Sequence, residues 1–326
     1  MKKNSHPELS LVIPVYNEEE SLPVLYGEIN DSCEELGKSF EIVFIDDGST
    51  DGSGKVLKDI QKHDPRVRLI RLRKNFGQTA ALSAGFHHSK GKIIITMDAD
   101  LQNDPSDIGL LLEKMDEGYD IVSGWRIKRK DKFFSRRLPS RIANWLISVI
   151  TRVKLHDYGC TLKAFQRDVI ENIHLYGEMH RFIPAIASTM GVTIAEVKVH
   201  HRPRKYGKSK YTLMRIVKVI LDLLTVKFLL SYSTRPLQIF GLFGLISGLS
   251  GGVLAVILSY QRLVLMQSIA NRPLLLLAVL LLLIGFQFIT LGLLAEILVR
   301  SYHETLQKKT YYIKEILEDE SEEEKR

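Results

Sequence analysis

The sequence predicts an α/β domain with a mostly parallel sheet, followed by two helices long enough to cross a membrane. Three observations predict this class. From residue 9 to residue 124, short apolar runs alternate with segments of helical spacing. Two later stretches, 237–261 and 274–295, contain no Asp, Glu, Lys or Arg. Polar residues directly follow three of the expected strands, where parallel sheets bind their ligands.

Each expected strand is an apolar run bounded by residues that favour turns. The first run ends near Pro14 and Asn17, and the second runs into the turn-forming sequence Asp46-Asp47-Gly48. Helices of about ten residues or more separate the strands, so the crossovers are expected to be right-handed and the sheet parallel. The expected strands are 9–15, 41–46, 67–72, 93–97 and 120–124, and the expected helices are 18–37, 53–63, 77–89 and 106–118.

The two charge-free stretches are long enough to cross a membrane. At ~1.5 Å per residue, each can cross a hydrocarbon core of ~30 Å. A pair of buried core helices is the alternative, which two such lengths in succession disfavour. The first stretch contains several glycines, which permit close helix approach in lipid and therefore make homo-oligomerisation possible.

Two further segments, 140–153 and 211–232, have the pattern of basic amphipathic helices that lie in a membrane interface. Packing on the sheet is the alternative for both. The pattern does not choose between these for 140–153. For 211–232 the interface is favoured, because the first charge-free stretch follows directly.

The ends of the chain predict its orientation. Met1-Lys2-Lys3 leads into the first strand without an apolar leader, so we expect the α/β domain to remain cytoplasmic. Two spans then place both termini in the cytoplasm, and basic residues flank the spans on that side. Cys33 and Cys160 lie far apart and predict neither a disulfide framework nor a metal site.

Basic residues gather in two clusters, 126–141 and 198–215. Such clusters beside membrane segments indicate anionic headgroups or a phosphate-bearing lipid substrate. Nucleic acid is disfavoured as a partner, because no nucleic-acid motif accompanies the charge. Guanidinium groups bind phosphate through paired hydrogen bonds, so arginines of the first cluster are candidates for an acceptor phosphate. A loop at 202–210 could close over a diphosphate and neutralise it.

Three aspartate motifs are candidate ligand sites. Asp98-Ala99-Asp100 ends a buried strand and offers the hard oxygen ligands that Mg²⁺ and Mn²⁺ prefer; a short acidic turn is the alternative. Asp46 suits the N–H groups or ribose hydroxyls of a nucleoside, with a helix-capping turn as the alternative. Taken alone, Asp157 has the pattern of an ordinary turn aspartate.

Together these motifs resemble the family 2 glycosyltransferases with the GT-A fold, and more narrowly the polyprenyl-phosphate glycosyltransferases, which include dolichyl-phosphate-mannose synthase and the bactoprenol glucosyltransferases. The resemblance extends from about residue 8 to residue 300. The segments that carry it are 12–18, 46–51, 75–78, 98–102, 157–160 and 204–210.

The resemblance implies a role for each group of candidate residues. Asp157 would lie at the reaction centre, contrary to its interpretation as an ordinary turn residue. Mg²⁺ or Mn²⁺ would bind Asp98, Asp100 and Gln102. The nucleotide sugar would contact Pro14, Tyr16, Glu18, Asp46 and Asp98. The acceptor phosphate and the diphosphate would contact Arg126, Arg136, Arg137, Ser140, Arg204, Lys205 and Lys210.

The expected reaction is transfer of a hexose, glucose from UDP-glucose, to undecaprenyl phosphate or a similar lipid at the cytoplasmic face of a bacterial inner membrane. Mannose, an aminosugar or aminoarabinose are alternatives for the sugar. A membrane-anchored nucleotide-sugar sensor or scaffold without catalysis is the alternative function. The expected regions are a GT-A domain at 1–210, an interfacial helix at 211–235, two membrane helices at 236–300 and a charged cytoplasmic tail at 301–326.

Overall fold

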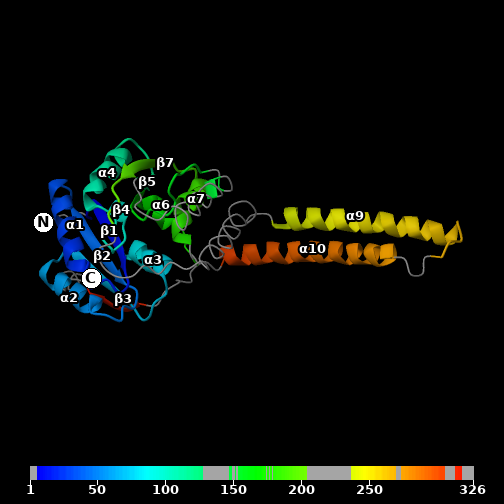
Figure 1. Cartoon of the computed structure of the whole chain (residues 1–326), viewed down its shortest axis with the longest axis horizontal. Helices are drawn as coiled ribbons and strands as arrows, with labels where there is room; N and C mark the ends of the chain where they lie inside the picture. The colour runs from blue at the N-terminus through cyan, green and yellow to red at the C-terminus, as the bar shows by residue number, and fades with distance from the viewer. Residues whose placement is uncertain are drawn as a thin grey trace. The chain divides into compact units, whose positions relative to one another are not determined.

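The computed structural model divides the chain into two compact units, Met1–Val226 with Lys309–Arg326, and Lys227–Lys308 (Figure 1). Within them the structure describes the residues 6–127, 147–148, 151, 153–173, 175, 177, 179–203, 236–268, 273–304 and 313–317. Most of the predicted interfacial helix 140–153 and all of 211–235 lie outside the described residues.

Among the described residues of the first unit, eight strands form one mixed sheet in the order β7-β5-β6-β4-β1-β2-β3-β8. Neighbouring strands from β4 through β1 and β2 to β3 are parallel, and so are β5 and β7, whereas β6 and β8 run antiparallel to their partners. The strands are β1 Leu9–Val15, β2 Phe40–Asp46, β3 Val67–Leu72, β4 Ile93–Thr96, β5 Ile121–Arg126, β6 Lys163–Gln166, β7 Ile194–Val199 and β8 Ile313–Leu317.

Helices cover both faces of this sheet. Leu11 of β1 packs in one cluster with side chains of α1, α2 and α4. Val12, which points to the opposite face, lies against α3, where a Cβ on Gly85 would come within 2.3 Å of Val12 Cγ1. Burial on both faces explains why β1 and β2 are almost continuously apolar. The longer helices are α1 Leu22–Glu35, α2 Ser53–His63, α3 Gln78–His88 and α4 Ile108–Asp116.

The sequence predicted the first five strands and four helices to within a few residues at each end. The later elements are short, and the sequence analysis did not identify them. They are β6, α6 Arg167–Glu171, η3 Met179–Phe182, α7 Ile183–Ala187, η4 Ser188–Met190 and β7. The 3₁₀ turn η1 Pro105–Asp107 precedes α4, and the side chain of Asp104 accepts from Ser106 N at its start.

The strand β8 differs from the expectation of a charged tail over 301–326. It pairs antiparallel with β3, with Ile316 opposite Ile70 and Glu315 opposite Arg71. Backbone hydrogen bonds, which leave no side-chain pattern, hold such an edge strand, and acidic residues follow it in the sequence. The first unit therefore contains chain from before and after the two long helices.

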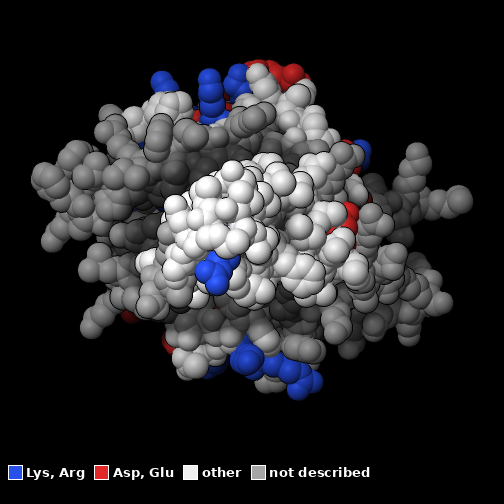
Figure 2. Space-filling view, turned by 90° about the vertical axis from the view of Figure 1, so that its right-hand side faces the viewer, with Lys and Arg blue, Asp and Glu red and all other residues white. Residues whose placement is uncertain are grey.

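The second unit contains the helices α9 Pro236–Leu263 and α10 Pro273–Glu304, which pack side by side as a hairpin (Figure 1). Both are long and apolar enough, by length and composition, to cross a membrane. Many of their large apolar side chains are exposed, and uncharged atoms dominate the end of the hairpin that faces the viewer in Figure 2. These properties are those of a helical hairpin that is surrounded by the hydrocarbon core of a membrane.

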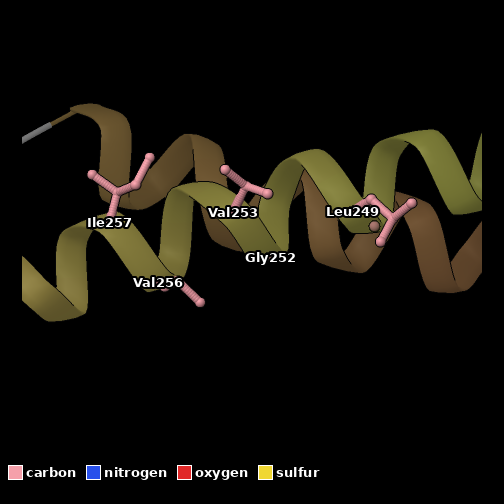
Figure 3. A pocket seen from close by; sticks show the side chains of 6 residues that line it. Leu249, Gly252, Val253, Val256 and Ile257 are labelled. Carbon is pink, nitrogen blue, oxygen red and sulfur yellow. The ribbon is translucent and has the colours of Figure 1, made fainter.

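Glycines bring α9 and α10 into close contact. A Cβ on Gly244 would lie 2.8 Å from the carbonyl oxygen of Gly285, and one on Gly251 would lie 2.9 Å from that of Ala278. In contrast, a Cβ on Gly252 would meet nothing within 4 Å. A groove of about 380 Å³ lies there on the surface of α9 (Figure 3), lined by Gly248, Leu249, Gly252, Val253, Val256 and Ile257. Self-association through this span stays a prediction.

Candidate active site

The loops that follow β1 and β2 meet at the carboxyl edge of the sheet, because Val15 is paired with Asp46 in the parallel register. Pro14, Tyr16 and Glu18 are all half-buried there. Half-buried side chains at this edge are accessible to a ligand, as expected for contacts to a nucleotide sugar. Their assignment to that ligand stays a prediction.

Hydrogen bonds join these two loops. Asn17 has a positive φ of 57°, and its Oδ1 accepts from Thr50 N at 2.8 Å. Ser53 Oγ accepts from Glu18 N at 2.9 Å, and Glu19 Oε2 accepts from Gly52 N at 2.9 Å. The β1 loop and the β2 loop therefore form one connected surface, held together by hydrogen bonds between their polar residues.

Asp46 is buried and already has protein partners. Its Oδ1 accepts from Ser49 N at 2.8 Å, and its Oδ2 lies 3.2 Å from Arg71 Nε. The contact with Ser49 is the turn that was the alternative to a nucleoside site. Both roles are compatible, because a carboxylate has about four acceptor positions. Arg71 lies within β3, and its contact with Asp46 was not predicted from the sequence.

Asp47 organises the loop before α3. Its buried carboxylate accepts from Phe76 N at 2.7 Å and from Gly77 N at 2.9 Å. Burial raises the pKa of Asp47, and these two backbone donors partly oppose that rise. The loop leads directly into Gln78, whose Nε2 donates to Asp98 Oδ1 at 2.8 Å. Asp47 is thereby connected to the candidate metal site through two backbone contacts and one side chain.

The candidate metal ligands Asp98 and Asp100 follow β4 and are half-buried. Burial raises the pKa of Asp98, and the charge of Asp100 raises it further. Asp100 Oδ1 accepts from Gln102 N at 3.1 Å, and Leu101 between them has a positive φ of 59°. The turn therefore holds the two carboxylates close enough to repel each other, an arrangement that a bound cation relieves.

The residues present fit a divalent ion. Asp98, Asp100 and the side-chain amide of Gln102 are oxygen ligands, which Mg²⁺ and Mn²⁺ prefer. In the described part of the chain, no group of three or more His, Cys, Asp or Glu residues gathers as a metal site. Two carboxylates and an amide leave coordination positions for phosphate oxygens, which is the usual arrangement for Mg²⁺ bound with a nucleotide.

Arg126 and Asp157, which lie 31 positions apart, form a buried ion pair. Arg126 Nε donates to Asp157 Oδ2 at 2.7 Å and Nη2 donates to Oδ1 at 2.9 Å, so both carboxylate oxygens accept from one guanidinium. Although burial lowers the pKa of Arg126, the hydrogen bonds and charge of Asp157 raise it overall. The structure thus brings together a predicted phosphate ligand and the predicted residue of the reaction centre.

The second basic cluster begins at a segment anchored to acidic side chains. Arg202 lies 2.8 Å from Asp104 and 2.7 Å from Glu28, and its backbone N donates to Gln102 O at 3.0 Å. His200 Nδ1 lies 2.7 Å from Asp107 Oδ1, and these contacts raise the pKa of His200. The predicted phosphate ligands Arg136, Arg137, Ser140, Arg204, Lys205 and Lys210 lie outside the described residues.

Several site residues were not assigned from the sequence. Gln78 lies in the segment 75–78, which carries part of the family resemblance but to which no role was assigned. Asn103 Oδ1 accepts from both Asp98 N at 3.2 Å and Thr161 Oγ1 at 3.0 Å, and so joins the candidate metal turn to the segment after Asp157. Asn103 directly follows the Asp98–Gln102 motif, and this position in the sequence could have indicated that it belongs to the site.

Comparison with known proteins identifies the family. A model of "Glycosyl transferase family 2" matches residues 10–174. The chain belongs to glycosyltransferase family 2. The matched range contains the β1, β2 and β4 loops and the Arg126–Asp157 pair, so the candidate site lies within the family domain.

Two bacterial relatives match almost the whole chain. The dodecaprenyl-phosphate galacturonate synthase of Rhizobium johnstonii is 41% identical over 318 residues, covering 96% of this chain and 94% of the relative. The undecaprenyl-phosphate 4-deoxy-4-formamido-L-arabinose transferase of Salmonella typhimurium is 41% identical over 316 residues, covering 96% and 95%. The alignments therefore include the two long helices as well as the family domain.

Among solved structures, the chain is similar in fold to glucosyl-3-phosphoglycerate synthase from Mycobacterium tuberculosis in complex with Mn²⁺, UDP and phosphoglyceric acid. The TM-score is 0.53 at 19% identity, over 68% of this chain and 78% of that one. This likeness supports the GT-A fold. The predicted family, fold class and enzyme class are thus confirmed.

Proposed function

We propose that this glycosyltransferase transfers a sugar from a nucleotide sugar to a polyprenyl phosphate. The observation that carries the proposal is the combination, in one chain, of a family 2 domain and two helices of membrane length. Both relatives, which span the same combination, are named for a polyprenyl-phosphate product or acceptor. A lipid acceptor requires an enzyme that remains at the membrane, which the hairpin provides.

The sugar is best proposed as a modified one. The prediction of glucose finds no support in the relatives, which are named for galacturonate and for 4-deoxy-4-formamido-L-arabinose. Aminoarabinose was among the sequence-based alternatives. We propose that the transferred sugar is either a derivative of aminoarabinose or a uronate. UDP is the proposed nucleotide. Its nucleoside would contact Pro14, Tyr16, Glu18 and Asp46.

In the proposed reaction, an oxygen of the lipid phosphate attacks the anomeric carbon. The new bond joins that carbon to the lipid phosphate, the bond to the diphosphate breaks, and UDP leaves; by family analogy the anomeric centre inverts. A phosphate monoester has a second pKa of about 6, so the nucleophile is already charged at neutral pH. The main task is to hold two anions together, which cations accomplish.

Arg126 and Asp157 divide this task on the acceptor side. The guanidinium of Arg126 would donate hydrogen bonds to the lipid phosphate, and Asp157 fixes its orientation through two hydrogen bonds. Because both oxygens of Asp157 accept from Arg126, its carboxylate is a weak proton acceptor. We therefore assign Asp157 to orientation and charge stabilisation at the reaction centre, with proton transfer as a secondary role.

Mg²⁺ or Mn²⁺ would be held by Asp98, Asp100 and Gln102, and when bound it would neutralise the leaving diphosphate. Gln78 donates to Asp98 and so orients the carboxylate that would hold the ion. The proposed location is a bacterial inner membrane, with the catalytic domain and both termini in the cytoplasm. Support comes from β8, which pairs with β3 after both long helices and so returns the chain to the first unit.

A transfer assay tests the proposal. Membranes that contain the protein are incubated with undecaprenyl phosphate, Mn²⁺ and a panel of radiolabelled UDP-sugars, including glucose, galacturonate and formamido-arabinose. We expect chloroform-soluble radiolabel with one of the modified sugars, and none without the ion. If UDP-sugars bind but no donor yields lipid-linked label, the chain is the membrane-anchored sensor or scaffold instead.

A further inference from the structure

A row of four side chains crosses the sheet near the segment that carries Asp157. In the strand registers, Ser123 of β5 stands opposite Glu196 of β7 on one side and opposite Lys163 of β6 on the other. Lys163 in turn stands opposite Thr96 of β4. Because directly opposed residues point to the same face of a sheet, these four side chains lie side by side.

Glu196 holds the backbone at the start of the Asp157 segment. Its Oε1 accepts from His156 N at 2.8 Å and from Asp157 N at 3.1 Å. Its Oε2 lies 2.8 Å from His156 Nδ1, and the His156 ring stacks on Trp125 with centroids 4.1 Å apart. The Glu196 side chain is only 11% exposed, so little water competes for these contacts.

Lys163 and Thr96 hold the rest of the segment through its carbonyl groups. The buried Nζ of Lys163 donates to the carbonyl oxygens of Tyr158 and Cys160. Thr96 Oγ1 donates to Thr161 O at 2.6 Å. The row therefore matches the polarity of the segment, with a carboxylate acceptor at its N–H groups and an amine and a hydroxyl as donors at its carbonyl groups.

Arg126 and Glu196 constrain different parts of Asp157. Arg126 binds its carboxylate, whereas Glu196 binds its backbone N–H and that of the preceding residue. A bidentate pair depends on the position of the Cα atom as well as on the side-chain rotamer, since both oxygens must reach one guanidinium. Glu196 accepts from both N–H groups with one carboxylate oxygen, so it fixes the backbone on either side of the His156–Asp157 peptide bond.

We propose that Glu196 is a positioning residue for sugar transfer, which fixes the backbone at Asp157 so that its carboxylate meets Arg126. This inference rests on the proposed function, in which Asp157 lies at the reaction centre. Among the described residues, the hydrogen bonds of Glu196 go to His156 and Asp157, and not to the loops after β1 and β2 or to the Asp98 turn. Its effect should therefore fall on turnover and leave the binding of the nucleotide sugar unchanged.

The test compares Glu196→Ala and Glu196→Gln with the wild-type, full-length protein. We expect Glu196→Ala to lower kcat on the order of 10²-fold, because small displacements of a catalytic group have effects of that size. The KM for the nucleotide sugar should stay within about twofold of wild type. Glu196→Gln keeps one carbonyl oxygen for the two N–H groups, so it should restore part of kcat.

Hydrogen exchange provides a readout that does not depend on activity. Exchange at the amides of His156 and Asp157 should accelerate in Glu196→Ala and less so in Glu196→Gln. Glu171→Ala is the matched control, because Glu171 is exposed and pairs with Arg167 in α6, at 3.4 Å. The control should match wild type in kcat and in exchange at both amides.

A folded Glu196→Ala protein with wild-type kcat and wild-type exchange at these amides would overturn the inference. Equal losses of kcat and nucleotide-sugar affinity would also overturn it, since they would indicate general destabilisation. If Glu196→Ala does not fold, Glu196→Gln decides by the same two measurements. A wild-type protein that transfers no sugar would refute the proposed function instead, and the exchange comparison would still decide whether Glu196 positions the segment.

Discussion

The two sides of the candidate site treat negative charge in opposite ways. On the sugar-donor side, Asp98 accepts from the Gln78 amide and Asp100 accepts from the Gln102 backbone, and the charge of Asp100 adds to burial in raising the pKa of Asp98. On the acceptor side, Asp157 is paired with Arg126 in two hydrogen bonds. The donor-side carboxylates therefore repel each other, which a cation would relieve, whereas the acceptor-side carboxylate is already paired with a guanidinium.

The two sides therefore make different contributions. A turn in which two carboxylates repel each other would be completed by a divalent ion and a diphosphate. A bidentate ion pair is already rigid before any ligand binds, and its value lies in orientation. We therefore expect changes on the donor side to alter the dependence on metal and nucleotide, and changes on the acceptor side to alter turnover.

The largest expected effect follows from Asp157→Asn. The amide has one oxygen and places an NH₂ donor where the second carboxylate oxygen was, so the guanidinium loses its paired contact and its countercharge. We expect kcat to fall about 10²–10³-fold, as when a preorganised group at a reaction centre is lost. Product formation on lipid extracts measures kcat. Turnover like that of wild type would show that the ion pair has no part in the reaction.

The next largest effect is expected on the donor side. Asp98→Ala removes one of three candidate metal ligands, so the Mn²⁺ concentration that gives half-maximal turnover should rise by about 10- to 100-fold. Metal titration of the transfer rate measures this shift. The control is Asp116→Ala, which removes an exposed carboxylate at the end of α4. An unchanged Mn²⁺ requirement in Asp98→Ala would exclude Asp98 as a ligand.

A smaller effect is expected from Asp47→Ala, which tests the support beneath the donor side. The backbone N–H groups of Phe76 and Gly77 would lose their acceptor, at a cost of about 1–3 kcal/mol in the free energy of unfolding. Thermal unfolding in detergent should shift downward accordingly. Asp59→Ala, on the exposed side of α2, should leave it unchanged; equal midpoints for the two variants would contradict the support role.

The smallest effect is expected at the two cysteine thiols, which should not react in the native protein. Burial raises the pKa of Cys33 to about 12 and also raises the pKa of Cys160, which lies just after Asp157. A pKa above the ambient pH leaves the thiol protonated, so at pH 8 neither side chain should react with iodoacetamide in the native protein. Mass spectrometry should detect alkylation of both only after denaturation. Native labelling of Cys160 would show that the acceptor side opens.

The two sides also differed in how far the sequence predicted them. The residues of the donor side lie in three short runs, 12–18, 46–51 and 98–102. Each run lies at the end of a strand whose apolar pattern was clear. Parallel strands then bring those runs to one edge without further information. The fold of the first five strands was predictable for the same reason.

The acceptor side depends on contacts between residues that are distant in the sequence. Glu196 meets His156 across 40 positions, and Arg126 meets Asp157 across 31. Glu196 lies in β7, and Asp157 lies in the segment before β6; both strands are surrounded by short or irregular segments, so periodicity could not place them. For this reason Asp157 was predicted from family resemblance alone, and Glu196 was not predicted at all.

The most direct test of the division between the two sides is the affinity for UDP with Mn²⁺, measured by calorimetry on Asp98→Ala and Asp157→Asn in parallel. We predict that Asp98→Ala weakens UDP binding by about tenfold or more, while Asp157→Asn binds UDP as wild type does. Equal weakening in both variants would contradict the account, because the acceptor-side pair would then take part in holding the nucleotide.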